Sequence, residues 1–407
     1  MSAPLPLDDA CRTGRMPRGV WVLGFVSLLM DISSEMIHRL LPLFMVSVLG
    51  ASALGVGLVE GLAESTAMVV KVFSGTLSDY LGRRKALALT GYALSALTKP
   101  LFALAPSLGV VLGARLLDRV GKGIRGAPRD ALVADLVAPE IRGAAFGLRQ
   151  ALDTVGAFAG PLLAVMLMLF LNGNFRAIFW VALLPGGLCV ALLFFGLSEP
   201  AHDAGAGRPG NPLRRASLQR LGASYWGVVG IGALFSLARF SEAFLVLRAM
   251  QLGVAAAWVP LCLVAMNLVY AASAYPFGKL ADRCRHSDLL ALGLVLLIAA
   301  DLILARAQHV GMLVAGLALW GGHLGATQGL LNAMVADTAP GDLRGTAFGV
   351  FNLACGLALL PASLLAGELW DRFGAGATFE VGAGLCALTL VVLRVFSRHA
   401  VSRPRLF

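Results

Sequence analysis

Long apolar stretches alternate with short polar connections along almost the whole chain. Twelve stretches have helical length, and few charged residues interrupt them. A helix needs about 20 apolar residues to cross a bilayer, so each stretch is predicted to be a transmembrane helix. The stretches cover residues 20–49, 54–78, 86–105, 108–130, 142–171, 175–197, 222–247, 252–278, 288–306, 310–335, 345–368 and 376–396.

Composition narrows the class of protein further. The 407 residues are 58% hydrophobic and 14% charged, whereas soluble domains are about 45–50% apolar and about 25% charged. A water-soluble enzyme of this size and a disordered chain are therefore both disfavoured. The strands of a membrane barrel would alternate over about 10 residues, which these stretches do not. The predicted fold is an all-α membrane protein with twelve transmembrane helices.

The polar connections alternate in charge. Residues 50–54 and 105–107 are nearly uncharged, whereas residues 83–85, 208–220 and 279–285 and both tails are rich in arginine and lysine. The positive-inside rule then predicts that both termini and the even-numbered loops are cytoplasmic, in the cell (inner or plasma) membrane. The net charge of +10 thus reflects membrane topology, and no nucleic-acid partner is expected.

The two halves of the chain repeat each other. The segment Ala131–Asp135 recurs as Ala333–Asp337, and Arg142–Gly147 recurs as Arg344–Gly349, both 202 positions later. Such a duplication predicts two pseudo-symmetric six-helix bundles, an architecture of secondary transporters. The predicted organisation is a cytoplasmic tail (1–19), a first bundle (20–198), a cytoplasmic linker (199–221), a second bundle (222–397) and a cytoplasmic tail (398–407).

The loop between the second and third stretches contains a recognisable sequence motif. Residues Gly75 to Lys85 follow the pattern G-x-L-x-D-x-x-G-R-[RK]-[RK], and a degenerate copy runs from Gly278 to Arg285. This resembles the signature of the major facilitator superfamily, and the likeness extends over residues 20–398. The resemblance implies that the loop latches the cytoplasmic side; the alternative is that its arginines only set topology. The latch candidates are Gly75, Asp79, Gly82, Arg83, Arg84 and Asp282.

The fifth stretch contains a second family-like motif. Gly147, Gly156, Gly160 and Pro161 resemble the antiporter signature G-x8-G-x3-G-P-x-x-G-G, although alanine and valine replace its last two glycines. The resemblance implies efflux by proton antiport. Small residues also let membrane helices pack closely in general, which is the alternative reading.

The fourth stretch resembles a third family segment, R-x-x-Q-G-x-G-A-A. Arg119 matches the arginine that the family links to proton coupling, whereas Lys122 and Arg125 replace the usual glutamine and glycine. At the 202-residue offset, Asp118 becomes Trp320 and Arg119 becomes Gly321, while Lys122 becomes Leu324 and Arg125 becomes Thr327. The fold therefore does not require these charges, which favours a functional role.

Ionisable groups inside the predicted spans are the candidate site residues, because each costs about 2.5–3.5 kcal/mol to insert. Acids of the first two stretches are expected to pair with the cations of the fourth, either to carry protons or as static salt bridges. The proton-coupling candidates are Asp31, Glu35, Glu60, Glu64 and Arg119. The substrate-cavity candidates are Arg115, Asp118, Lys122, Arg125, Arg239, Glu242, Asn267, His323 and Gln328. Arg239 and Glu242 have the spacing to pair with each other, and His323 has the alternative of a packed core histidine.

These features predict a secondary active transporter. The leading hypothesis is a proton-coupled antiporter that exports a small polar or anionic molecule by alternating access; the alternative is an uptake symporter for an organic anion. A membrane sensor or membrane-embedded enzyme is disfavoured, because the sequence has no G-x-S-x-G or H-E-x-x-H motif and no large loop. No cofactor and no metal site are expected. The expected partners are the bilayer, protons and a small-molecule substrate, with the protein as a monomer.

Overall fold

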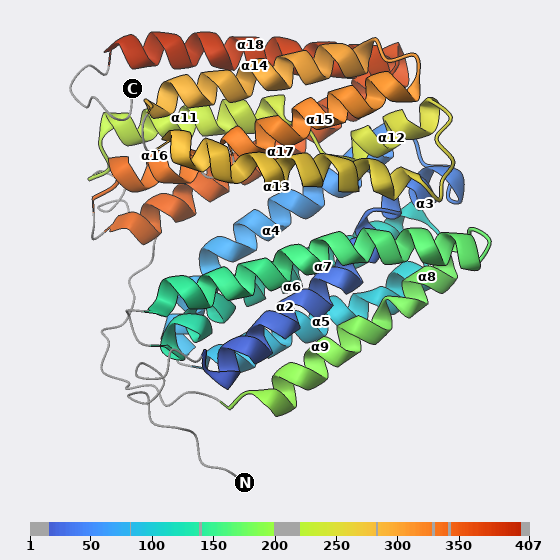
Figure 1. Cartoon of the computed structure of the whole chain (residues 1–407), viewed down its shortest axis with the longest axis vertical. Coiled ribbons are helices and arrows are strands. Elements are labelled where there is room, and N and C mark those ends of the chain that lie inside the picture. The colour runs from blue at the N-terminus through green and yellow to red at the C-terminus, as the bar shows by residue number, and fades with distance from the viewer. Residues whose placement is uncertain are drawn as a thin grey trace. The chain divides into compact units, whose positions relative to one another are not determined.

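The computed structural model describes residues 16–81, 83–137, 141–198, 220–281, 284–327, 330–340 and 343–399. All the regular elements in these ranges are helices, which confirms the predicted all-α class (Figure 1). The first six apolar stretches form α2 (Arg18–His38), α3 (Leu41–Ser47), α4 (Ala53–Leu81), α5 (Arg84–Leu104), α6 (Leu108–Asp135), α7 (Arg142–Phe170), α8 (Phe175–Val181) and α9 (Leu183–Gly196). The last six form α11 (Ala223–Ala238), α12 (Ala243–Gln251), α13 (Val259–Ala281), α14 (His286–Ala305), α15 (Val310–Thr327), α16 (Leu330–Thr338), α17 (Arg344–Phe373) and α18 (Ala375–His399).

Most of these helices have the length and hydropathy of membrane spans. Within the described ranges, 10 helical segments meet both criteria. The fourth and eighth predicted spans fall outside that set. Helix α6 is 28 residues long but carries a stripe of charged residues, and the apolar part of α13 is the shorter segment Val259–Ala274. The fourth span is thus set apart by charge, the feature that marks it as a candidate site.

Two of the predicted spans are interrupted at matching places. The first breaks after His38, and Pro42 follows in the first turn of α3. Proline lacks a backbone N–H and restricts the residue before it, which favours the break. In the second half, α11 ends at Ala238 and α12 begins at Ala243, whose N–H is accepted by Ser241 Oγ at 3.2 Å. Both repeats therefore bend one helix at its middle.

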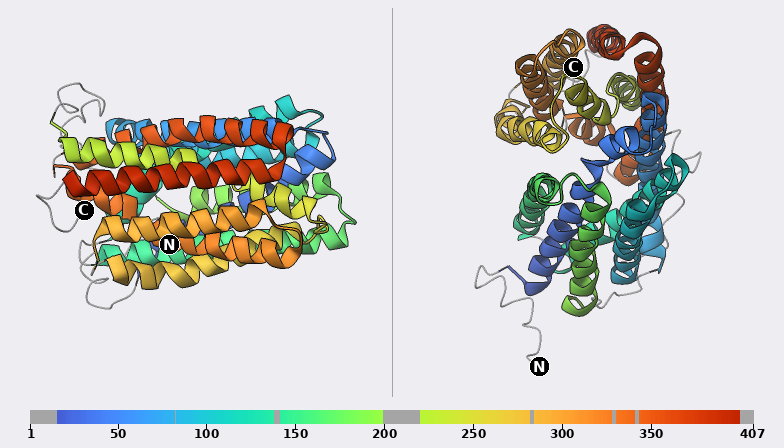
Figure 2. Two further views of the ribbon diagram at one scale, coloured as in Figure 1. Left: turned by 90° about the horizontal axis from the view of Figure 1, so that it is seen from above. Right: turned by 90° about the vertical axis from the view of Figure 1, so that its right-hand side faces the viewer.

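The chain divides into two compact units. The first unit contains Met1–Leu40 and Val70–Gly210, and the second contains Leu41–Val69 and Asn211–Phe407. Within each unit the helices run side by side along their length (Figure 2). The division runs through α4, whose N-terminal part packs in the second unit. Of the predicted linker 199–221, residues 199–219 lie outside the described ranges.

The sequence repeat is also a repeat in packing. In the first unit α5 meets α6 so closely that a Cβ on Gly91 would lie 2.8 Å from Arg125 Cβ. In the second unit α14 meets α15 in the same way, and the Cβ of Gly293 would overlap Thr327. Gly293 and Thr327 are 202 positions after Gly91 and Arg125. The offset read from the sequence therefore matches equivalent positions in the two units.

Candidate transport site

The first unit contains an ion pair buried between α5 and α6. Lys99 Nζ lies 3.3 Å from Asp118 Oδ1 and also donates to Ser34 Oγ at 3.2 Å. The relative exposure of these residues is 0% for Lys99 and 2% for Asp118. Since an isolated charge in this environment would be very unfavourable, the lysine and the carboxylate stabilise each other.

His38 joins the same network from α2. Its Nε2 lies 3.2 Å from Asp118 Oδ2, and its Nδ1 lies 3.4 Å from Arg119 Nη2. A guanidinium group can only donate hydrogen bonds, so Nδ1 accepts from Arg119. The ring proton then resides on Nε2 and is donated to Asp118. His38 is therefore neutral here and links a carboxylate to a guanidinium.

Further along α6, hydroxyl groups and an aromatic ring hold the cations. Arg125 Nη1 donates to Ser95 Oγ at 2.6 Å, and its guanidinium carbon lies 4.7 Å from the centre of the Tyr92 ring. Arg129 Nη1 donates to Ser27 Oγ at 3.4 Å. Neighbouring helices thus hold these cations largely through neutral groups. Of the other predicted cavity residues on α6, Arg115 is buried and Lys122 is exposed.

The acidic candidates of α2 have different surroundings. Asp31 lies beside Asp153 of α7, and Arg149 Nη1 lies 3.8 Å from Asp153 Oδ2. Glu35 accepts from Arg39 Nε at 2.6 Å, one turn along the same helix. Two neighbouring carboxylates repel each other when both are ionised. Asp31 and Asp153 therefore form a pair of neighbouring acids between α2 and α7.

The glycines of the antiporter-like motif shape this seam. A Cβ on Gly156 would lie 2.6 Å from the Leu28 carbonyl oxygen and 3.0 Å from Asp31 Cβ, and one on Gly160 would lie 2.8 Å from Glu35 Cβ. Pro161 follows inside α7. Gly147 has open space around it, with nothing within 4 Å of its Cβ position. Two of the three glycines therefore bring the α7 backbone onto the acidic face of α2.

The other sequence candidates of the first half lie elsewhere. Glu60 is buried and Glu64 is half-buried, both on the part of α4 that packs in the second unit. In the latch segment, Arg84 forms an ion pair with Asp135 at the end of α6, and Arg83 is exposed. Gly82 and Asp282 lie outside the described residues, as do the side-chain surroundings of Gly75 and Asp79.

The candidate site residues of the second unit have less polar surroundings. His323 is fully buried, donates from Nδ1 to the Gly293 carbonyl at 2.9 Å and packs with its ring 5.4 Å from that of Phe235. Arg239 lies in the bend after α11, with its guanidinium carbon 5.9 Å from the Phe235 ring. The remaining candidates are Glu242 and Asn267, both half-buried, and Gln328, which lies outside the described residues.

Some residues that complete the network of the first unit are not among those predicted from the sequence. Lys99 was not among the candidates, although it is a cation in an apolar stretch directly before Pro100. Ionisable residues inside a span are functional candidates by default, so this signal was available. The partners Ser34, Ser95 and Tyr92 carry no comparable signal, because small hydroxyl and aromatic residues are common in membrane helices.

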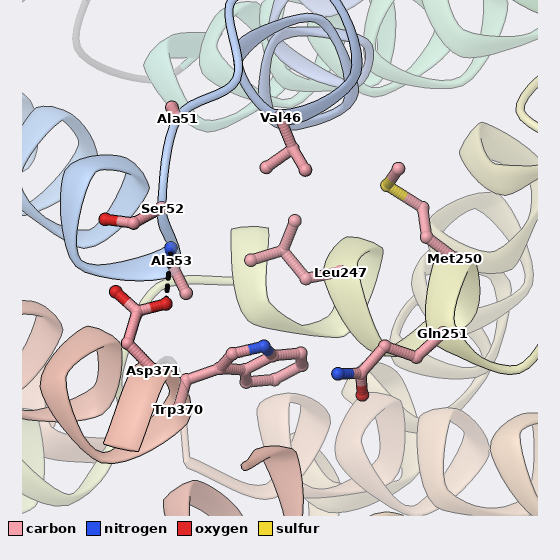
Figure 3. Close-up of a pocket in the computed structure, with 9 residues that line it drawn as sticks. All are labelled: Val46, Ala51, Ser52, Ala53, Leu247, Met250, Gln251, Trp370 and Asp371. Atoms are coloured by element: carbon pink, nitrogen blue, oxygen red, sulfur yellow. Dashed lines mark hydrogen bonds between the residues drawn. The ribbon is translucent and has the colours of Figure 1, made fainter. Parts of the chain in front are cut away.

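A pocket of about 410 Å³ opens in the second unit beside the start of α4 (Figure 3). Both oxygens of Asp371 accept backbone N–H groups there, from Ala53 at 2.9 Å and from Leu54 at 2.8 Å. The carboxylate thus caps the N-terminus of α4, where the helix dipole favours an anion. Trp370 and Gln251 line the pocket, which contains none of the predicted site residues.

An all-helical membrane protein with two six-span repeats and a charged network inside one of them has the architecture of a secondary transporter. The family model of the Major Facilitator Superfamily matches residues 23–267 and 243–406. The chain belongs to this superfamily, as its loop motif indicated.

Relatives and solved structures agree with this assignment. The chain is 34% identical over 386 residues to the "Uncharacterized MFS-type transporter MJ1317" of Methanocaldococcus jannaschii, covering 93% of this chain and 94% of the relative. It is 30% identical over 184 residues to the "Multidrug resistance protein MdtH" of Photorhabdus laumondii, covering 45% and 44%. A crystal structure of the peptide transporter POT in complex with sulfate shares the fold, with a TM-score of 0.79, 15% identity, and coverage of 94% and 95%.

Proposed function

We propose that this transporter is a proton-coupled antiporter that exports a small polar or anionic molecule, and that it has no enzymatic activity. The observation that carries the proposal is the glycine seam between α2 and α7, where Gly156 and Gly160 hold the α7 backbone against Asp31 and Glu35. The partial match to a protein named for multidrug resistance supports the export direction. With the basic loops inside, both termini are cytoplasmic and the protein acts as a monomer in the cell membrane.

The Asp31–Asp153 pair supplies the proton-binding chemistry. Two adjacent carboxyl groups do not readily ionise together, because the second negative charge is repelled by the first. The pair therefore keeps one proton while the seam is closed. When α7 moves away from α2 and water enters, the shared proton is released. Alternating access to the two sides of the membrane would turn this step into coupling.

Vesicle assays test the proposal directly. Wild-type protein and Asp31→Asn are reconstituted in proteoliposomes with a pH-sensitive dye and an imposed pH gradient, and candidate anions and cationic drugs are then added. We expect substrate-evoked proton flux opposite to substrate movement, and its loss in the variant. Asp288→Asn is the matched control, because Asp288 is an exposed carboxylate that pairs with Arg394. Proton flux in the same direction as the substrate would rule out antiport.

One observation favours the alternative, uptake of an organic anion together with a proton. His38 accepts from Arg119 through Nδ1 only while it is neutral. Protonation of Nδ1 removes that acceptor, so the same Arg119 N–H group can donate to an anion instead. An anion that draws Arg119 away likewise leaves Nδ1 available to a proton. Proton and anion would then bind together, which is the linkage required for symport.

His38→Gln separates the two candidate functions. Glutamine offers an acceptor oxygen to Arg119 and a donor N–H to Asp118, so it reproduces neutral histidine but does not titrate. If His38 couples symport, the variant keeps anion binding but loses the pH dependence of that binding. If Asp31 couples antiport, the variant retains proton-coupled export, while Asp31→Asn abolishes it.

A further inference from the structure

Asp301 is a buried acid that the proposed mechanism does not use. It lies on α14 with 0% exposure, and neither carboxyl oxygen has a hydrogen-bond partner among the described residues. It also forms no ion pair within those residues. In the repeat register Asp301 is equivalent to Lys99, and Trp320 is equivalent to Asp118. The position that holds a cation–carboxylate pair in the first unit therefore holds, in the second, an acid that has no counter-ion among the described residues.

The surroundings of Asp301 are apolar and tightly packed. A Cβ on Gly382 of α18 would lie 3.0 Å from Asp301 Oδ2 and 2.9 Å from Phe240, so glycine is what leaves room for the acid. The Phe240 ring lies 5.7 Å from that of Trp320 and 5.4 Å from that of Phe379. The carboxyl group is fully buried and none of the described residues pairs with it as a cation, so the neutral acid is the stable form.

Titratable groups on the neighbouring helices do not replace a counter-ion. The Cys386 thiol of α18 lies near Asp301 but carries no positive charge. The other groups are engaged elsewhere: His323 of α15 bonds the Gly293 carbonyl, Arg248 of α12 bonds carbonyls at the end of α14, and Asp337 of α16 lies 3.7 Å from His286. Arg239 lies over the Phe235 ring.

We propose that Asp301 is a second proton-binding group of this transporter and holds a proton in the conformation described here. The neighbouring residue Phe240 belongs to the unwound segment between α11 and α12, so movement of that bend would open the carboxyl group to water. The O–H bond then breaks, and the proton passes to water. The binding of this proton is independent of the transport mechanism, whereas its release during the cycle rests on the proposed proton-coupled function.

Infrared difference spectroscopy of the purified full-length protein tests proton binding without a substrate. A rise in pH that ionises the acid should remove its protonated-acid carbonyl band from the wild-type spectrum. We expect Asp301→Asn to lose one such band, distinct from any band of the Asp31–Asp153 pair, and Asp288→Asn, which alters the exposed carboxylate on the same helix, to keep it. Asparagine has the shape of the neutral acid, so the variant should fold, and Asp301→Glu should restore a shifted band. Retention of the wild-type band in Asp301→Asn would overturn the proposal.

Further measurements distinguish failure of the proton-binding site from failure of the release step or of the proposed transport function. Asp301→Asn in proteoliposomes should lower the number of protons moved per substrate; an unchanged ratio and pH profile would overturn the release step. Absence of transport in the wild type with the infrared band present would refute the proposed function and leave the proton site standing. Sodium chloride alone should not raise the thermal stability of wild type above that of Asp301→Asn, and a selective rise would instead assign a sodium site.

Discussion

Equivalent places in the two units hold opposite chemistry. In the first unit Lys99, Asp118 and His38 form a buried polar network. In the second unit, Asp301, Trp320 and Phe240 occupy the positions equivalent to these three residues, in the same order. The helices pack in the same way around both, with Gly91 against Arg125 in one and Gly293 against Thr327 in the other. The same packing therefore forms with and without the charges, so the network is not a requirement of the fold.

The energetics of buried charges explain how the same helix packing accommodates a charged network in one unit and a mainly aromatic set of side chains in the other. Replacement of a buried ion pair by well-packed apolar residues is often neutral or stabilising, by about 1–4 kcal/mol, whereas removal of one partner is strongly destabilising. The second unit resembles a partial replacement, because Trp320 stands in place of Asp118 and packs with Phe240 and Phe379, while Asp301 remains as an acid. The first unit retains its charges, which is expected if they bind a substrate or a proton.

The largest expected effect comes from removing one charge of the first unit. Asp118→Asn leaves the buried Lys99 ammonium without its carboxylate, so we expect a loss of about 3–5 kcal/mol in the free energy of unfolding. Thermal and denaturant unfolding in detergent measure it. The control is Asp288→Asn, which removes an exposed ion pair and should cost about 0–1 kcal/mol. Equal stability of the two variants would mean that the first unit tolerates charge loss as the second does.

Removing both charges of the Lys99–Asp118 pair tests whether the first unit folds without its ion pair, as the second unit does. The double variant Lys99→Met with Asp118→Leu removes the buried ion pair of the first unit. We expect its stability to return to within about 1–2 kcal/mol of wild type, because no unpaired charge remains, while transport is lost. Unfolding and vesicle uptake are measured on the same preparation. A double variant as unstable as Asp118→Asn would show that the network is structural.

The two units also show which structural features could be predicted from the sequence. The spans and the repeat followed from hydropathy and a constant offset, because burial in lipid constrains every turn of a helix. The ion pairs between side chains could not be predicted from these sequence features. Glu35 pairs with Arg39 on its own helix, and Asp118 pairs with Lys99, which was not a candidate. Such pairings depend on how each helix is rotated about its axis, which charge spacing within one helix does not determine.

A smaller effect is expected at the glycine seam of the first unit. Gly156→Ala places a methyl group 2.6 Å from the Leu28 carbonyl oxygen, so α7 must shift away from α2, at about 1–3 kcal/mol. Gly147→Ala is the matched control on the same helix, since its Cβ meets nothing within 4 Å. We expect proton-coupled transport to fall in the first variant only. Equal activity of the two variants would contradict a role for the seam in coupling.

The smallest effect is expected where the second unit uses a charge at its surface. Asp371 is exposed and accepts from the N–H groups of Ala53 and Leu54, so Asp371→Ala removes a helix cap at about 1 kcal/mol. Glu368→Ala is the control on α17, because its ion pair with Arg372 is exposed and contributes little. Unfolding measurements should rank Asp118→Asn above Asp371→Ala and Asp371→Ala above Glu368→Ala. If Asp371→Ala matched Asp118→Asn, an exposed cap would matter as much as a buried charge, and burial would no longer explain the difference between the units.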